Sequence, residues 1–180
     1  RDNEINHVWS NRTIRGAGVY MHQSGSAFTG CQITGNTLRS SHNDWAYSRG
    51  AGLCISEGDV AISNCIISDN KIEANGRYQY QRGAGIATWS SELFIENSEI
   101  SRNLMITNGN ADINRWGGGL WRDGGGTTNL VNVTVAYNEA QGLYRENGTI
   151  NSYNSIIWGN EWNDSGSSRN YYYSNKSKIY

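Results

Sequence analysis

One short phrase recurs four times along this chain, as Arg15-Gly16-Ala17-Gly18-Val19, Arg49-Gly50-Ala51-Gly52-Leu53, Arg82-Gly83-Ala84-Gly85-Ile86 and Trp116-Gly117-Gly118-Gly119-Leu120. The first residues of successive phrases are 34, 33 and 34 positions apart. A fixed period of this length is the mark of a solenoid, in which each repeat packs only on its neighbours. The phrase therefore predicts a stack of similar coils.

A second signature occurs once after each phrase and a fifth time near the end: a six-residue segment with Ile or Val in third place and Asn in sixth. These segments are Cys31–Asn36, Cys65–Asn70, Ser98–Asn103, Val133–Asn138 and Ser155–Asn160. Strand alternation points the first and third residues inward and the second outward. Stacked Asn amides about 4.8 Å apart can hydrogen-bond along the stack and satisfy backbone groups at a corner.

A second corner column precedes these segments at Asn64, Asn97, Asn132 and Asn154, with Gly30 in the first repeat. Asn tolerates the left-handed backbone that such corners need, and Gly adopts it without a Cβ penalty. Three short strands, a glycine corner and two Asn corners predict an all-β, parallel β-helix.

The coil count follows from the spacing. The last coil needs only 22 residues, from Asn138 to Asn160, whereas the first three repeats carry about a dozen more each. We expect these additions to be three long loops stacked on one side, at Thr37–Ser48, Lys71–Gln81 and Leu104–Arg115. The prediction is one domain, 1–180, of five to six coils, with 1–14 a partial first coil, 15–160 the repeats and 161–180 a C-terminal extension or cap. Within the first part, Val8-Trp9-Ser10-Asn11 matches the tail of a repeat.

The bulk composition excludes several partners. A net charge of −1 with 17% charged residues gives no sign of nucleic acid or an anionic membrane as partner. We expect no membrane span, because no apolar run reaches about 18 residues. No Cys/His spacing resembles a zinc site and the loop carboxylates are too few for calcium, so we expect neither a metal nor a cofactor.

Three cysteines cannot form a closed set of disulfides. Cys31 and Cys65 share an inward column on successive coils, where they are either buried thiols or a cross-coil disulfide. Cys54 is expected on an outward position beside Tyr20, Ala87 and Trp121.

The three loops hold interleaved aromatic and charged residues. Trp and Tyr offer large contact area with few rotatable bonds, which predicts a ligand-binding surface for a sugar or a protein. Its members are Trp45, Tyr47, Tyr78, Tyr80 and Trp116. The alternative is that these rings fold back over the apolar side of the coil.

Catalytic residues are hard to find. The outward positions of the Asn segments hold one carboxylate, Glu99, which cannot supply an acid and base pair. Weak catalytic candidates lie instead in the loops, at His42, Asp44, Arg77 and Asp112.

Charged columns also follow from the stacking. Arg15, Arg49 and Arg82 would stand about 4.8 Å apart, which is unfavourable unless they are paired or fanned out. We expect a column splayed into water, with anion or loop-carboxylate binding as the alternative. Asp69 and Arg102 are stacked equivalents that favour a partly exposed ion pair.

Five Asn-x-Ser/Thr sequons could accept a glycan on a eukaryotic secretory route. They begin at Asn11, Asn132, Asn147, Asn163 and Asn175.

These motifs resemble the right-handed parallel β-helix superfamily typified by pectate lyases. They are also similar to the Gly-Gly-Ala-(Ile/Leu/Val) and Phe-x-x-Asn repeats of chlamydial polymorphic outer membrane proteins. Here the order is Gly-Ala-Gly-(Val/Leu/Ile), and Ile/Val-x-x precedes the Asn. The resemblance implies a right-handed coil in a secreted or cell-surface protein; the superfamily includes adhesins, passenger domains and polysaccharide enzymes.

The functional expectation is an extracellular structural or adhesive module, a segment or subunit of a surface fibre. It would self-associate through exposed coil ends and meet a glycan or surface partner on the loop face. The alternatives are a polysaccharide lyase or hydrolase, and a carbohydrate-binding β-helix without catalysis.

Overall fold

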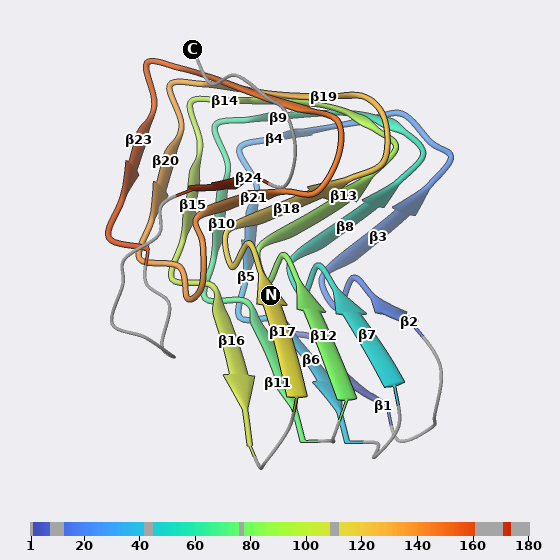
Figure 1. Ribbon diagram of the computed structural model, residues 1–180. Helices are drawn as coiled ribbons and strands as arrows, with labels where there is room; N and C mark the ends of the chain where they lie inside the picture. The colour runs from blue at the N-terminus through green and yellow to red at the C-terminus, as the bar shows by residue number, and fades with distance from the viewer. Residues whose placement is uncertain are drawn as a thin grey trace.

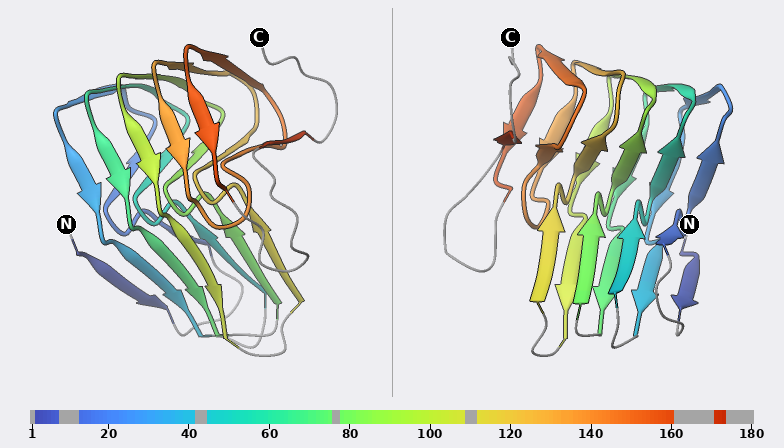
Figure 2. Two further views of the ribbon diagram at one scale, coloured as in Figure 1. Left: turned by 90° about the vertical axis from the view of Figure 1, so that its left-hand side faces the viewer. Right: turned by 45° about the vertical axis from the view of Figure 1, so that its right-hand side comes forward.

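The computed structural model describes residues 2–7, 13–41, 45–75, 78–108, 112–160 and 171–173. These residues form a solenoid whose strand pairs are all parallel, in five sheets that run along the stack (Figures 1 and 2). Each sheet takes one strand from successive turns, so its neighbours are about five strands apart in the sequence. The predicted parallel β-helix is confirmed.

Three sheets build the coil itself. Coil sheet one contains β3 (Val19–His22), β8 (Leu53–Ser56), β13 (Ile86–Trp89), β18 (Leu120–Asp123), β21 (Leu143–Arg145) and β24 (Tyr171–Tyr173). Coil sheet two contains β4 (Ser26–Thr29), β9 (Asp59–Ser63), β14 (Glu92–Glu96), β19 (Thr127–Val131) and β22 (Thr149–Tyr153). Coil sheet three contains β5 (Gln32–Thr34), β10 (Ile66–Ser68), β15 (Glu99–Ser101), β20 (Thr134–Ala136) and β23 (Ile156–Trp158).

Two further sheets form an arm that projects from one corner of the coil (Figure 1). Arm sheet one contains β1 (Glu4–His7), β6 (Thr37–Ser40), β11 (Lys71–Ala74) and β16 (Leu104–Thr107). Arm sheet two contains β2 (Thr13–Arg15), β7 (Trp45–Arg49), β12 (Tyr78–Arg82) and β17 (Asp112–Trp116).

The arm corrects the expectation of three loops. The additions do stack on one side, but most of their residues are strands, because equal additions on successive turns bring backbone groups into register. A fourth arm pair, β1 and β2, comes from the residues expected to be a partial coil. Four turns thus pass through all five sheets, slightly fewer than expected, and β21–β23 form a shorter turn without an arm. Residues 8–11, the expected repeat tail, lie outside the described residues.

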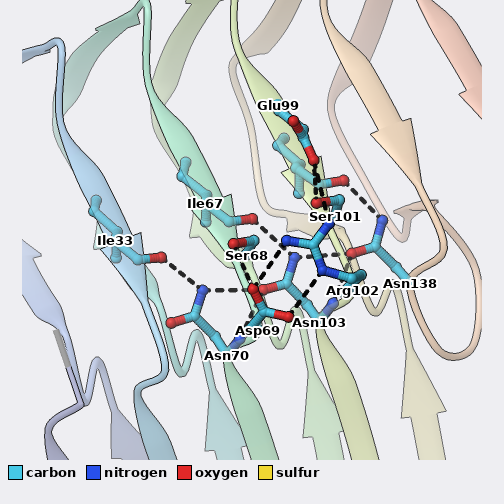
Figure 3. Close-up of polar contacts among 11 residues, drawn as sticks. Ile33, Ile67, Ser68, Asp69, Asn70, Glu99, Ser101, Arg102, Asn103 and Asn138 are labelled. Atoms are coloured by element: carbon cyan, nitrogen blue, oxygen red, sulfur yellow. Dashed lines mark hydrogen bonds and ion pairs between the residues drawn. The ribbon is translucent and has the colours of Figure 1, made fainter.

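The Asn ladder is confirmed (Figure 3). The side chain of Asn70 accepts hydrogen bonds from the backbone N–H and the amide of Asn36, at 3.2 and 2.8 Å. Its own amide donates to the Ile33 carbonyl at 2.9 Å and to Asn103 Oδ1 at 3.0 Å. All four of its hydrogen-bonding positions are used, which is what a buried amide requires.

The same pattern repeats at Asn103 and Asn138 and ends at Asn160. At the other end the ladder includes Asn3, which donates to Asn36 at 2.9 Å. Sequence reasoning had given that place to Asn11. The left-handed residue of this corner is the one before each ladder Asn, as at Asp69 and Arg102 (φ 57° and 52°).

The first and the last glycine of each phrase have different structural roles. Gly50 has φ +61°, and a Cβ there would lie 2.2 Å from the Leu53 carbonyl oxygen, so a side chain is excluded. At Gly52 a Cβ would lie 2.8 Å from Asn70 Nδ2 and 2.6 Å from the Gly85 oxygen. The second glycine is therefore needed for close packing against the ladder.

The alanine of each phrase packs into the arm. Ala51 and Ala84 are fully buried in one apolar cluster with Leu38, Ile72 and Met105. The fourth phrase has Gly118 in that place because the next turn lacks an arm. Its backbone closes in, and a Cβ on Gly118 would lie 1.6 Å from the Glu139 carbonyl oxygen.

Side chains replace the missing fifth arm. Glu139 accepts the backbone N–H of Met105 through Oε2 at 2.9 Å and pairs with Arg115 through Oε1 at 3.1 Å. Gln141 Oε1 accepts the N–H of Gly117 at 3.0 Å. Both side chains of the ion pair are nearly buried, so Glu139 and Gln141 cap the last arm strands.

Replacing the ladder amide Asn103→Ala leaves several buried donors and acceptors without partners. Because each such group costs about 1–3 kcal/mol, we expect the free energy of unfolding to fall by about 3 kcal/mol or more in urea titrations. The control is Asn97→Gly, at an exposed corner with φ 47°, which should change it by less than about 1 kcal/mol. Equal losses in the two variants would contradict the role given to the ladder.

Removing the cap with Glu139→Ala takes the carboxylate away from the nearly buried charge of Arg115. We expect a loss of about 3–5 kcal/mol in the same measurement, and a smaller loss for Glu139→Gln, which keeps an acceptor for Met105. The control Asp69→Asn removes the charge of the half-exposed pair with Arg102, keeps a residue that tolerates the left-handed backbone at φ 57°, and should lose less than about 1 kcal/mol.

Candidate functional site

The second arm sheet and coil sheet one meet at the Arg-Gly-Ala-Gly turns, and their outer faces make contact there. The guanidinium of Arg82, at the end of β12, lies 4.7 Å from the ring centre of Trp121 on β18. The rings of Trp116 and Tyr144, from the two sheets, lie 5.9 Å apart. We call this corner the elbow, defined by Arg15, Arg49, Arg82, Trp89, Trp116 and Trp121.

The five residues predicted to bind a ligand come together on the outer face of arm sheet two. Trp45 stacks on Tyr78 and Tyr80 with ring centres 5.3 and 5.4 Å apart, and Tyr47 stacks on Tyr80 at 4.8 Å. Trp116 continues the row at 5.8 Å from Tyr80. The row runs along the stack and ends in the elbow. The five residues therefore share one face, as predicted, and their role in binding a ligand stays a prediction.

The stacking limits how this row could hold a sugar. Interplanar angles of 13° to 16° mean that neighbouring rings cover one another's faces. A ligand would meet ring edges along most of the row. Trp45, 45% exposed, is the most accessible of the five.

The arginine column is not splayed into water, which corrects the expectation. Arg49 and Arg82 lie in register on neighbouring strands and each is only 9% exposed. Aromatic rings separate them from solvent. Arg82 contacts Trp116 and Trp121 at 5.1 and 4.7 Å, measured from its guanidinium carbon to the ring centres. Arg49 contacts Trp89 and Trp121 at 5.0 and 5.3 Å.

The aromatic rings that lie between the arginines explain how like charges can stand one strand apart. The negative faces of the rings stabilise the guanidinium groups by about 1–2 kcal/mol each when water is excluded. Glu146 adds a distant carboxylate, 3.8 Å from Arg82. Sequence reasoning missed Trp89 and Trp121 as partners of these arginines, although Trp121 was expected on the outward face.

A further buried arginine, Arg122, was not foreseen. Its side chain points into the coil from β18 and has no exposed surface. Strand alternation puts it on the same inward face as Leu120. It donates to Thr128 Oγ1 and to the carbonyls of Ser91 and Gly125, at 2.7 to 2.9 Å. Burial lowers its pKa to about 10. These acceptors make Arg122 a tie between coil sheets one and two.

The weak catalytic candidates cannot be assembled here. His42, Asp44 and Arg77 lie outside the described residues, as does the side chain of Asp112, whose backbone begins β17. In the described part of the chain, no group of three or more His, Cys, Asp and Glu side chains could hold a metal ion.

Two of the five sequons are described, and both asparagines are exposed. Asn132 donates to Asn97 Oδ1 at 3.1 Å, and Asn147 donates to Asp123 Oδ1 at 2.7 Å. Asn11, Asn163 and Asn175 fall outside the described ranges. Glycosylation at all five stays a prediction.

The cysteines are free thiols. Cys31 and Cys65 stack without a disulfide, and Cys65 Sγ accepts the Cys31 N–H at 3.3 Å. Cys54 lies on the outward face between Tyr20 and Ala87, as expected, and is buried in the elbow with Trp121. This burial raises the pKa of the Cys54 thiol to about 12.

The raised pKa of Cys54 predicts a loss of stability in alkali. Below an ordinary thiol pKa of about 8.5 the group is neutral in both states. Above it only the unfolded chain ionises, so stability falls by roughly 1.4 kcal/mol per pH unit until the folded-state pKa is reached. The control Cys54→Ala carries the residue that occupies the next turn, Ala87. In urea titrations from neutral to alkaline pH, the free energy of unfolding of wild type should fall relative to that of Cys54→Ala. Parallel pH dependence of the two free energies would contradict the burial effect.

Comparison with known proteins gives one finding. The family model described as "Right handed beta helix region" matches residues 1–179, nearly the whole chain. No curated protein and no solved structure gave a match. Among the described residues no helix is long and apolar enough to cross a membrane. The extent of the match and the parallel solenoid agree: this chain belongs to the right-handed β-helix family.

Proposed function

We propose that this chain is an extracellular structural or adhesive module that extends a surface fibre by end-to-end stacking of coils. The observation that carries the proposal is the edge of the first described turn. Among the described residues, β3, β4 and β5 are terminal strands of their sheets, and terminal strands offer backbone groups to a further strand. The same holds for β1 and β2 in the arm.

The ladder gives this edge a polarity. Each ladder Asn donates its amide to the Asn of the following turn. Asn3 Oδ1 begins the row and accepts no hydrogen bond from the described residues. An incoming coil that ends in an Asn amide would continue the row in the same direction. This is the polarity that head-to-tail association of a second copy requires.

The last turn that the structure describes supports the proposal with apolar surface on its outer face. On β23, the terminal described strand of coil sheet three, the outward-facing Ile156 and Trp158 are 61% and 64% exposed. Large apolar side chains at this exposure are typical of contact surfaces when they cluster. The exposed sequons Asn132 and Asn147 fit an extracellular setting, and glycans there would lie away from the first-turn edge.

Assembly can be tested by electron microscopy and sedimentation over a concentration series. We expect rods whose axial repeat is about 25 Å, the height of five strand layers at about 4.8 Å each. Dispersed particles at every concentration would contradict the proposal.

A substitution at the edge sharpens the test. The N–H after each ladder Asn donates to the preceding turn, as Lys71 does to Asn36 and Leu104 to Asn70. Glu4 holds this place in the first turn, so Glu4→Pro removes a donor and adds a ring at the open edge without breaking a backbone bond within the stack. We expect association to weaken about fivefold or more, whereas Glu4→Ala, which loses the same side chain, should assemble like wild type.

A second candidate function, carbohydrate binding without catalysis, is favoured by the aromatic row with Trp45 at 45% exposure. A glycan array would test it directly. Retention that is lost in Trp45→Ala but kept in Trp89→Ala, on the coil, would support it.

A further inference from the structure

The elbow holds an arginine whose hydrogen-bonding needs are unmet. Arg49 is 9% exposed, and its Nε has no hydrogen-bond partner. Its neighbour in the column, Arg82, lies 3.8 Å from Glu146. No carboxylate among the described residues forms an ion pair with Arg49. An unpaired buried charge of this kind is costly unless a counter-charge is supplied.

The surrounding rings do not supply it. Trp89 and Trp121, at 5.0 and 5.3 Å, stabilise the guanidinium through their ring faces. A guanidinium carries its five N–H donors in its own plane, and each of them needs an acceptor. Aromatic carbon offers none, so these contacts lower the cost of the charge but leave the buried Nε–H of Arg49 without an acceptor.

Charge accumulates at this point of the column. Arg15 and Arg82 pair in register with Arg49 from the two neighbouring strands. Burial and these two positive neighbours lower the pKa of Arg49, an effect that Cys54 and Asp123 only partly oppose. The middle of the column is therefore the place where an anion would be held most strongly.

A cavity of about 10 Å³ lies beside these groups. Its lining includes Arg15 and Arg49, with Cys54, Trp89 and Trp121. This is room for a single particle of about the size of a water molecule. Sulfate or a carboxylate is far too large to enter whole, whereas chloride, a single atom slightly larger than a water molecule, is the common anion nearest to this size and needs only a small outward shift of the arginine side chains.

We propose that the elbow cavity binds one halide ion, chloride under physiological conditions, between the guanidinium groups of Arg15 and Arg49. The ion accepts N–H groups of Arg49, whose Nε–H has no partner, and of Arg15, whose Nη1 also donates to the Tyr20 hydroxyl, and it offsets the repulsion within the arginine column. The site stabilises the elbow where arm sheet two joins coil sheet one. It is independent of the assembly proposed above.

The first test locates the ion. Crystals of the full chain grown or soaked in sodium bromide should show an anomalous peak within hydrogen-bonding distance of Arg49. A water molecule in the cavity, with no anomalous signal, would overturn the proposal.

The second test measures linkage in solution. Unfolding is followed as chloride replaces gluconate, an anion too large for the cavity, at constant ionic strength. A ligand bound only by the folded state lowers the unfolding equilibrium constant by the factor 1 + [L]/Kd, so about nine times Kd lowers it about tenfold. We expect this saturating dependence in wild type, and we expect bromide to reproduce it in place of chloride. An equal effect of sulfate would overturn the size argument.

Matched variants assign the effect. Arg49→Gln should abolish the chloride dependence and Arg15→Gln, at the cavity lining, should weaken it. Arg102→Gln removes the same charge from a half-exposed ion pair on another sheet and should keep it in full. If Arg49→Gln does not fold, Arg15→Gln and the bromide experiment still decide. Equal chloride dependence in Arg15→Gln and Arg102→Gln would contradict the site.

Discussion

The fold depends on one contact, between the Asn ladder and the second glycine of each phrase. Gly52 lies against the amide of Asn70, and Gly85 lies against that of Asn103, so closely that neither glycine has room for a Cβ. The two sequence signatures are therefore the two halves of one contact across the coil interior. Because the ladder uses every polar position of its amides, a turn that lost the contact would bury unsatisfied groups in two neighbouring turns as well. The same corner directs the chain into the arm, so the arm strands stay in register only while the ladder does.

This dependence explains how much of the fold could be predicted. In the coil, both residues of each contact recur at equivalent positions in successive repeats. The period, the corners and the inward positions could therefore all be deduced from the sequence. The arm could not, because its interior contains polar residues such as Ser48, Gln79 and Gln81, which are buried between two sheets yet are typical of loops. The alternation of Trp45, Tyr47 and Arg49 was the available signal. Asn3 could have been found from spacing, because it precedes Arg15 by 12 residues, as Asn70 precedes Arg82; the match of residues 8–11 to a repeat tail pointed to Asn11 instead.

The site shows the same division. The five aromatic residues could be grouped from the stacking alone, since equivalent positions on successive turns must be neighbours. The surroundings of the arginines could not, because they depend on the angle at which arm sheet two meets coil sheet one. That angle brings Trp121 from the coil over Arg82 from the arm. A column of like charge, which stacking by itself makes unfavourable, becomes tolerable because residues from a different part of the repeat enter between its members.

The two ends of the stack differ in how the hydrogen-bonding groups of their terminal strands are satisfied, and this difference bears on assembly. At the end of the arm, Glu139 and Gln141 take the hydrogen bonds that a further arm pair would have made, and Gly118 lets their backbone approach. These residues close the arm against further strands. The first turn has no such substitutes among its described residues: Asn3 stands where each later ladder Asn stands, and β1 to β5 keep the strand geometry of the turns that follow. At the end where the arm is closed, the described strands leave only the coil for a further turn to pair with: β22 and β23 are terminal in coil sheets two and three, and β24 already pairs with β21 in coil sheet one.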